Sequence, residues 1–244
     1  MDIAVRRGLE GRGGLTGFRY ASAALALAVT VPLAAARADS PAPWPDTPVA
    51  RLEALALIET LNAEILASRS ATFTLEKWCA DHRLSGAAEP KIVARQIAAK
   101  ERPATSEQRQ RLDVGPNEEI KVRHVQLLCG DRVFSEADNW YVPARLTAEM
   151  NRLLETTTTP FGKAVQDLHP YRRTFAATVL WWPLPEGWET KGPATSAQDA
   201  AKSLPIPDAL IEHRAVLYTE EGKPFSEVDE VYQHALLDFE PPAP

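Results

Sequence analysis

Hydrophobic and polar positions alternate with a period of two in several segments of this 244-residue sequence. In residues 120–143 two apolar-rich runs flank Gly130-Asp131. Glycine reaches positive φ without steric cost and suits a tight turn, so the segment is predicted to form a long β-hairpin. Other segments with a strand-like pattern are 91–99, 172–182 and the two arms of a second hairpin, 211–218 and 224–237.

Apolar residues recur elsewhere at steps of three to four, the period of an amphipathic helix. Residues 49–68 show one such stripe. Shorter helices are expected over 74–82, with Thr74 as its N-cap, and in the segment that starts near Leu146. Residues 101–117 contain two prolines and a glycine and are predicted to be a loop. An insertion is expected over 183–207, with a short helix over 196–202.

The first 38 residues have a composition of their own. Arginines are frequent up to Arg19, an apolar run covers 21–36, and Ala36-Arg37-Ala38 follows. A basic start, an apolar run and an A-x-A site are the pattern of a cleaved signal peptide, which predicts an exported protein, periplasmic or secreted. The run is short and alanine-rich for a membrane span, and an uncleaved anchor is the alternative. The expected organisation is a signal peptide (1–38), a proline-rich tether (39–48), one folded domain (49–239) and a disordered tail (240–244).

Charge and cysteine content narrow the classes of function. Without residues 1–38 the chain has 22 basic and 31 acidic residues, a net charge of −9. An acidic chain without a basic run is not expected to bind nucleic acid. Cys79 and Cys129 are the two cysteines, and either a disulfide in an exported protein or two buried thiols fits them. No residue spacing indicates a metal site, and no cofactor is expected.

Two charged residues fall among apolar neighbours. Arg123 shares a strand face with Val125, where a guanidinium is costly unless an anion meets it. An edge-strand arginine that reaches a surface carboxylate is the alternative. Glu230 lies between Val228 and Tyr232 on one face of the last strand. Burial there favours the protonated acid unless a cation such as Arg123 is close.

A threonine run ends in Thr159-Pro160-Phe161-Gly162. A short helix that begins at Pro160 would direct its N-terminal amides outward, where a carboxylate could bind. The alternative is an ordinary turn between two helices.

With these residues in view, the chain resembles the chorismate pyruvate-lyase family. The resemblance covers roughly residues 90–237, and its pieces occur in the order of the family. They are the strand from Arg123 to Leu127-Leu128-Cys129-Gly130-Asp131, then Tyr141-Val142-Pro143, then Thr159-Pro160-Phe161-Gly162, and finally Gly222-Lys223-Pro224 leading to Glu230-Val231-Tyr232.

The resemblance implies a single α+β domain, with helices packed over a mostly antiparallel sheet of about six strands. It implies elimination of pyruvate from chorismate, or from a related cyclic carboxylate, to leave an aromatic hydroxy acid such as 4-hydroxybenzoate, without a cofactor or metal. Arg123 would bind the ring carboxylate, the main chain at Phe161 would line the pocket, and Glu230 would act as general acid.

Two features depart from the family. Counted from Gly222, the family's glutamate falls on Asp229, so Glu227 or Asp229 could replace Glu230 unless a β-bulge absorbs one residue. Chorismate is also an intracellular compound, whereas this chain carries an export signal. The sequence therefore leaves open a lyase, a non-catalytic periplasmic module that binds small aromatic carboxylic acids, and a structural protein of the envelope.

Overall fold

A computed structural model describes residues 43–98, 102–191 and 202–240. The predicted signal peptide, the first residues of the lead-in and the end of the tail lie outside the described residues. The same holds for the helix predicted over 196–202, apart from Lys202.

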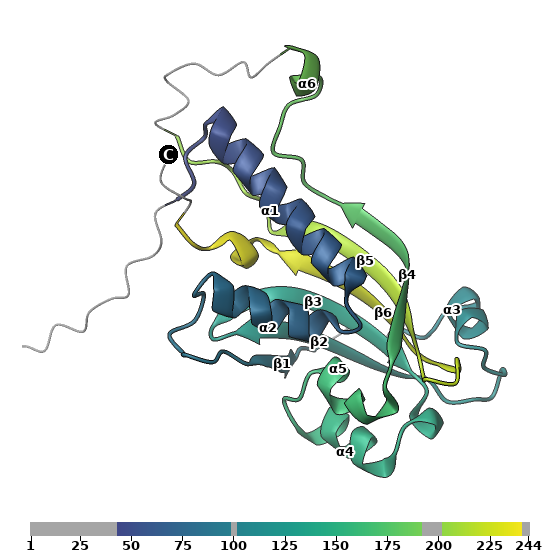
Figure 1. The fold of residues 1–244 in the computed structure, drawn as a ribbon. Coiled ribbons are helices and arrows are strands. Elements are labelled where there is room, and N and C mark those ends of the chain that lie inside the picture. The colour runs from purple at the N-terminus through teal and green to yellow at the C-terminus, as the bar shows by residue number, and fades with distance from the viewer. Residues whose placement is uncertain (1–42, 99–101, 192–201, 241–244) are drawn as a thin grey trace, which may run out of the picture. The chain divides into compact units, whose positions relative to one another are not determined.

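A six-stranded antiparallel sheet forms the centre of the fold (Figure 1), in the order β1-β2-β3-β6-β5-β4. Both predicted hairpins are present, and they join where β3 pairs with β6. The expected α+β fold with about six strands is therefore confirmed. The strands are β1 Ile92–Gln96, β2 Lys121–Cys129, β3 Arg132–Tyr141, β4 Tyr171–Val179, β5 Ala209–Tyr218 and β6 Pro224–Gln233.

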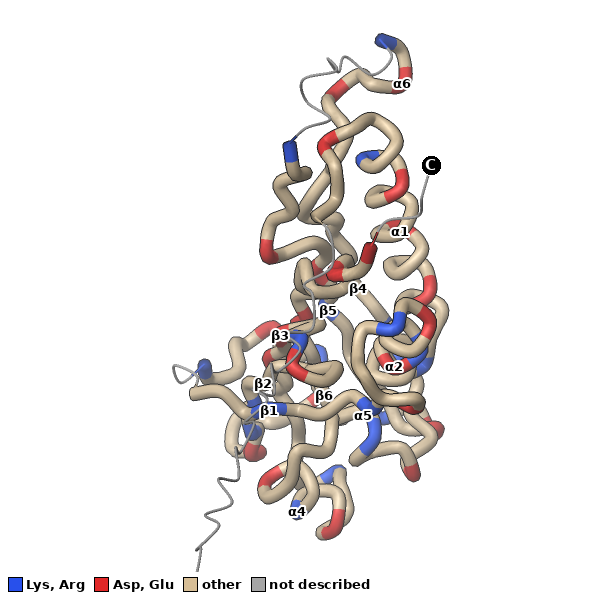
Figure 2. Tube along the Cα trace, turned by 90° about the vertical axis from the view of Figure 1, so that its left-hand side faces the viewer, with Lys and Arg blue, Asp and Glu red and all other residues tan. Residues whose placement is uncertain are grey.

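Helices α1 and α2 cover one face of the sheet, called the inner face from here on (Figures 1 and 2). The apolar stripe predicted over 49–68 lies against this face, with Ile58, Leu61 and Ile65 buried. Helices α4 and α5 pack at one end of the sheet. The helices are α1 Pro48–Ala67, α2 Ala71–Asp81, α3 Ser106–Arg111, α4 Ala148–Thr156, α5 Phe161–Ala164 and α6 Trp188–Lys191.

Three predictions of local structure from the sequence are wrong. Helix α2 begins at Ala71 with Ser70 as N-cap, so Thr74 is an internal residue. The loop predicted over 101–117 contains α3, which a capping box between Thr105 and Gln108 starts. The lead-in is not a free tether in its described part, because Trp44 is buried and donates a hydrogen bond to a main-chain carbonyl 193 residues away.

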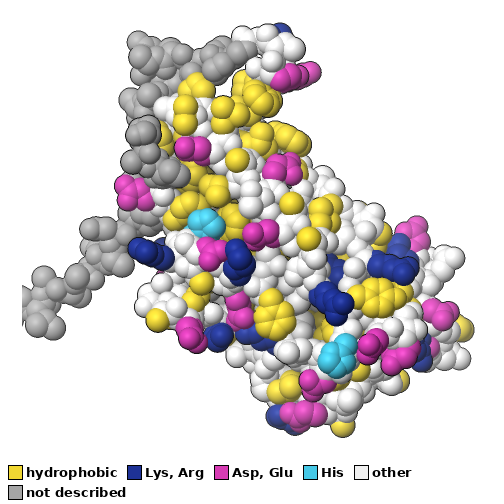
Figure 3. Space-filling model, viewed as in Figure 1, with side chains coloured by type: hydrophobic (Ala, Val, Ile, Leu, Met, Phe, Trp, Pro, Cys, Tyr) yellow, Lys and Arg dark blue, Asp and Glu magenta, His cyan; other side chains and the backbone are white. Residues whose placement is uncertain are grey.

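Surface hydrophobic side chains gather around α1 and the segment after β4 (Figure 3). Val49 and Leu52 of α1 and Trp182 beyond β4 are among the exposed apolar residues. None of the helices in the described ranges is both long and apolar enough to cross a membrane.

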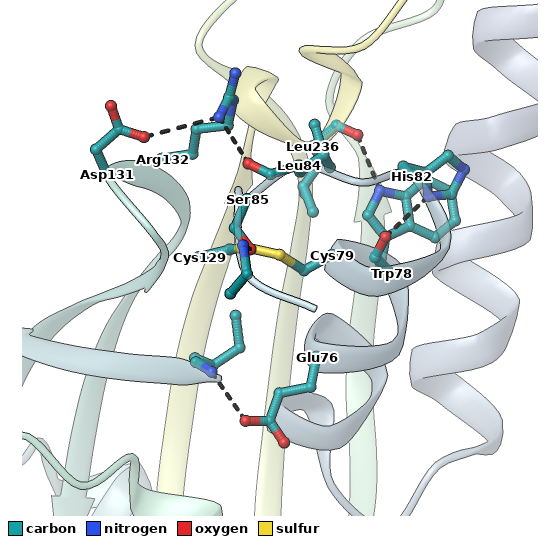
Figure 4. Close-up of a disulfide and its surroundings, with 12 residues drawn as sticks. Glu76, Trp78, Cys79, His82, Leu84, Ser85, Cys129, Asp131, Arg132 and Leu236 are labelled. Carbon is teal, nitrogen blue, oxygen red and sulfur yellow. Dashed lines mark hydrogen bonds and ion pairs between the residues drawn. A yellow bond between two sulfur atoms is a disulfide. The ribbon is translucent and has the colours of Figure 1, made fainter. Parts of the chain in front are cut away.

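A disulfide joins Cys79 of α2 to Cys129 at the end of β2 (Figure 4), with their Cα atoms 6.4 Å apart. Of the two possibilities that the sequence left open, the structure has the disulfide. The neighbouring Trp78 donates its indole N–H to the Leu236 carbonyl at 2.9 Å. The disulfide holds the C-terminal half of α2 to β2, and the indole bond holds it to the segment that follows β6.

We expect loss of this disulfide to destabilise the fold strongly. The bond closes a loop between residues 50 positions apart, which corresponds to about 4 kcal/mol of loop-closure entropy in the unfolded chain. Cys79→Ala/Cys129→Ala should therefore lower the free energy of unfolding by about 2–4 kcal/mol in urea titrations. Dithiothreitol should destabilise the wild type to the same extent and leave the double variant unaffected. An equal loss in both proteins on reduction would contradict the assignment.

Candidate functional site

A small cavity lies between the inner face of the sheet, the start of α2 and the start of α5. Its volume is about 40 Å³. A water molecule needs roughly 10–15 Å³ on such a measure, so the cavity holds roughly three waters and is smaller than the ~150 Å³ that accommodates benzene. Its wall consists of Arg69, Ser70, Ala71, Thr72, Val125, Leu127, Ala137, Asn139, Phe161, Gly162, Pro170, Arg172, Leu217, Val228 and Glu230.

Arg123 is buried on the inner face, with 2% of its surface exposed, so the surface alternative is wrong. Its Nη2 donates to the Thr159 carbonyl at 3.1 Å. Within the described residues, its Nε and Nη1 are buried and have no acceptor. Burial lowers the pKa of the guanidinium, while nearby Tyr141 opposes this effect. Arg123 does not line the cavity itself, but Asn139, its cross-strand partner, does.

Glu230 also points to the inner face, where its partner is Arg172 and not Arg123. The Arg172 Nη1 atom lies 2.6 Å from Glu230 Oε2, and the two side chains are 5% and 7% exposed. The Tyr232 hydroxyl donates to the same oxygen at 3.0 Å. Arg172 Nη2 is buried and has no acceptor among the described residues. The cavity thus contains a buried ion pair with one free guanidinium nitrogen.

The competing acidic positions are directed to the outer face of the sheet. Arg111 of α3 holds Glu227 with two hydrogen bonds of 2.8 Å. Asp229 lies 3.5 Å from Arg214 on the same face. Strand β6 carries one extra residue, Phe225, opposite the end of β5, which is a β-bulge close to the hairpin turn. This bulge provides the one-residue shift that places Glu230 on the inner face.

Phe161 begins α5 and forms one wall of the cavity. Its ring packs 5.7 Å from Tyr141 and 6.3 Å from Phe225, measured between centroids. The next residue, Gly162, lies so close to α2 that an added Cβ atom would be 2.7 Å from Ser70 Oγ. The starts of α2 and α5 therefore touch, and a side chain at 162 would displace the Ser70 hydroxyl.

Of the three residues predicted from the sequence, Phe161 and Glu230 line the cavity and Arg123 lies in the adjacent row of side chains. Arg172 was missed. It stands at the start of a predicted strand next to another arginine, Arg173, and the alternation pattern does not distinguish the two. Ser70 was missed because the start of α2 was placed too late.

His213 is a further buried polar residue of the inner face, on β5 opposite Glu230. Its Nε2 lies 2.8 Å from Oδ1 of Asn62, so Nε2 carries the proton and donates it. Its Nδ1 is buried and has no partner among the described residues. Burial and, to a lesser extent, the positive charge of Arg172 lower the pKa of His213 to about 4, against the opposing influence of Glu230.

This histidine should make the protein less stable in mild acid. The unfolded chain protonates it near pH 6.5, whereas the folded protein does so only near pH 4, so stability is lost as the pH falls between these values. The loss is at most about 3 kcal/mol. Asp229 acts in the opposite direction. Burial, followed by the nearby Glu212, raises its pKa to about 6. Its contribution to folding stability is therefore present at low pH and is lost as the pH rises.

Comparing His213→Gln with the wild type isolates the contribution of His213 to the pH dependence of stability. Urea titrations from pH 7 to pH 4 should show a smaller loss of stability in the variant. The exposed residue His234 offers the matched control, and His234→Gln should follow the wild-type profile. Identical slopes for His213→Gln and the wild type would show that His213 does not titrate as expected.

The chemistry of the inner face favours an anion. Two buried guanidinium groups direct free N–H donors into or beside the cavity. No group of His, Cys, Asp or Glu side chains in the described part of the chain could hold a metal ion.

The chain is similar to known proteins both in fold and in sequence. No protein-family profile matches the chain. Its fold is similar to the ligand-binding domain of a putative GntR-family transcriptional regulator from Bordetella bronchiseptica, with a TM-score of 0.37, 14% identity, and 58% of this chain and 82% of that chain covered. PhnF from Mycobacterium smegmatis gives a TM-score of 0.41 at 11% identity, with 68% and 64% covered.

The possible transcriptional regulator YydK from Bacillus subtilis gives a TM-score of 0.37 at 15% identity, with 63% of this chain covered. The match spans 62% of YydK, less than two thirds of its length. In sequence, a protein of Sinorhizobium fredii (strain NBRC 101917 / NGR234) is 51% identical over 201 residues, which cover 82% of this chain and 83% of that protein. The chain therefore belongs to the same family as this relative, the uncharacterized protein y4mC.

Proposed function

We propose that this protein binds a small organic carboxylate on the inner face of its sheet, between the strands and the starts of α2 and α5. The observation that carries the proposal is Arg123. It is a buried cation with two unpartnered N–H donors, and no carboxylate among the described residues forms an ion pair with it.

An unpaired buried guanidinium is unfavourable, because desolvation is not offset by an opposite charge. A carboxylate can accept hydrogen bonds from two guanidinium nitrogens at once, and such charge-assisted bonds are stronger than neutral ones. Arg123 has one nitrogen bound to Thr159 and two free. A ligand carboxylate would thus accept a hydrogen bond from a free donor of Arg123 and neutralise its charge.

Binding without turnover is the function we favour. A general acid must reach its substrate, whereas Oε2 of Glu230 already accepts hydrogen bonds from Arg172 at 2.6 Å and from the Tyr232 hydroxyl at 3.0 Å. The elimination of pyruvate implied by the resemblance is the second candidate, because Glu230 and Phe161 do line one cavity. The two functions separate in one assay, since only the lyase releases pyruvate from chorismate.

Calorimetry with purified protein tests the proposal. The panel runs from compact acids to 4-hydroxybenzoate and chorismate, because the cavity volume of about 40 Å³ admits an aromatic ring only if α2 or α5 moves outward. We expect saturable binding that Arg123→Met removes. The control is Arg95→Met, which changes an exposed arginine of β1 that contacts Gln126. No heat and no change in melting temperature with any acid would overturn the proposal.

We also propose that the protein works outside the cytoplasm. A disulfide is stable in an oxidising compartment, and residues 1–38 have the composition of a signal peptide. The expected mature protein begins at Asp39. Mass spectrometry of the protein from its native source checks this, and an intact Met1 start would contradict cleavage.

A further inference from the structure

We infer that the cavity contains a second oxyanion subsite, formed by Arg172 and the N-terminus of α2, and that the ligand is a compact dianion such as a short dicarboxylate. This inference rests on the proposed function and names the class of ligand for the same site. It assigns roles to Arg172 and Ser70 that neither the sequence pattern nor the resemblance provides.

The first turn of α2 is open toward the cavity. Ser70, Ala71 and Thr72 line it, and the 11-residue helix has no acidic residue in its first turn. Ser70 occupies the N-cap position, yet its side chain caps no main-chain N–H group. Its hydroxyl oxygen is buried and without a partner among the described residues. Free amides and the positive end of the helix dipole attract an anion.

Arg172 provides the independent second observation. Its side chain is 95% buried, since only 5% is exposed, and it forms part of the same cavity wall. Glu230 engages Nη1, which leaves Nη2 without an acceptor in the described part of the chain. Glu230 and Tyr232 therefore fix the orientation of the guanidinium and do not saturate it. On this basis Glu230 is a positioning residue for Arg172.

The charges in and beside the cavity are unbalanced. Among the buried groups, Arg123 and Arg172 contribute two guanidinium groups, against the single carboxylate of Glu230, while Arg69 at the rim is exposed to solvent. The nearby Lys163 pairs with Glu76 and changes nothing in this balance. One buried positive charge therefore remains, which the first anionic group of the ligand neutralises. The free Nη2 of Arg172 and the buried hydroxyl of Ser70 are the donors for the second anionic group.

The two guanidinium groups also have a spacing that suits one small ligand. Arg172 starts on the edge strand β4 but reaches over β5 to Glu230 on β6. Only β3 lies between β6 and β2, which carries Arg123. Strands are about 4.8 Å apart, so β6, which the Arg172 guanidinium reaches, and β2, which carries Arg123, lie roughly 10 Å apart.

Calorimetry with matched acids tests this inference on the whole mature chain. Malonate, succinate, glutarate and adipate are compared with monocarboxylates of equal carbon number. We expect the best dicarboxylate to bind at least tenfold more tightly than its matched monocarboxylate. Comparing the affinities of phosphoglycolate and glycolate tests whether a phosphate can replace the second carboxylate. If neither dianion binds more tightly than its monoanion, the second subsite is wrong.

Variants locate the second anion. Ser70→Ala should reduce dicarboxylate affinity three- to tenfold and leave monocarboxylate affinity unchanged. The control is Thr147→Ala, which removes the N-cap bond of α4 to Met150. It should lower the melting temperature without changing either affinity. Arg172→Met/Glu230→Leu removes the buried pair together, which avoids an unpaired charge, and should abolish the advantage of the dicarboxylate.

Failure of this inference can be told apart from failure of the proposed function. Monocarboxylate binding that depends on Arg123 but not on Ser70 or Arg172, with no advantage for dianions, overturns the second subsite alone. Absence of binding by every acid overturns both.

Discussion

Arg123→Met should make the ligand-free protein more stable while it removes carboxylate binding. Replacing even a buried ion pair by apolar side chains is often neutral or stabilising, by up to about 4 kcal/mol, and the unpaired Arg123 lacks the attraction that partly offsets desolvation in such a pair. Arg123 gives up only one protein hydrogen bond, to Thr159. The expected affinity loss is about 100-fold, or about 2.7 kcal/mol, for the loss of a charge-assisted contact.

Thermal unfolding and calorimetry on the same variant measure both effects. The matched control is Arg145→Met, because only 6% of the Arg145 side chain is exposed but its guanidinium donates to three carbonyls and to Glu118. That variant should lose stability. If Arg123→Met also unfolds several degrees earlier than the wild type, Arg123 is a structural residue and the proposed binding role loses its main support.

Breaking the Arg172–Glu230 pair from one side should be among the most damaging changes in the inner face. Glu230→Leu leaves a buried guanidinium without its partner and the Tyr232 hydroxyl without its acceptor. The expected loss of stability is about 3–5 kcal/mol. The double variant Arg172→Met/Glu230→Leu should recover most of the lost stability, because no unpaired charge remains.

Urea titrations of the two single variants and the double variant give the coupling energy of the pair. Additive losses would show that the two side chains do not stabilise one another. A separate variant, Glu230→Gln, tests the role of Glu230 in chemistry. Pyruvate release by the wild type that Glu230→Gln abolishes would restore the lyase hypothesis.

The sequence predicted the parts of this fold that depend on local periodicity. Both hairpins follow from alternation around Gly130 and Gly222, and α1 follows from its apolar stripe. The capping box of α3 was present in the sequence as Thr105 and Gln108 but was not recognised in a polar stretch. The start of α2 was misplaced because both Ser70 and Thr74 are acceptable caps.

The site was only partly predictable, since strand order is not a local property. Alternation correctly placed Arg123 and Glu230 on the inner face. It could not show that β4 returns to the far edge of the sheet, where Arg172 reaches Glu230 across β5. It also could not choose between Glu230 and Asp229, because that choice depends on the bulge at Phe225.

The central β3–β6 pairing has a consequence for how the chain folds. Strand β6 ends at Gln233, so the two hairpins cannot join into one sheet until nearly the whole polypeptide is present. Trp44 likewise finds its acceptor 193 residues later, near the other end of the chain. Contacts between such distant segments form slowly, because loop closure precedes the gain from pairing. The central sheet of this topology therefore cannot be completed until synthesis of the chain has almost ended.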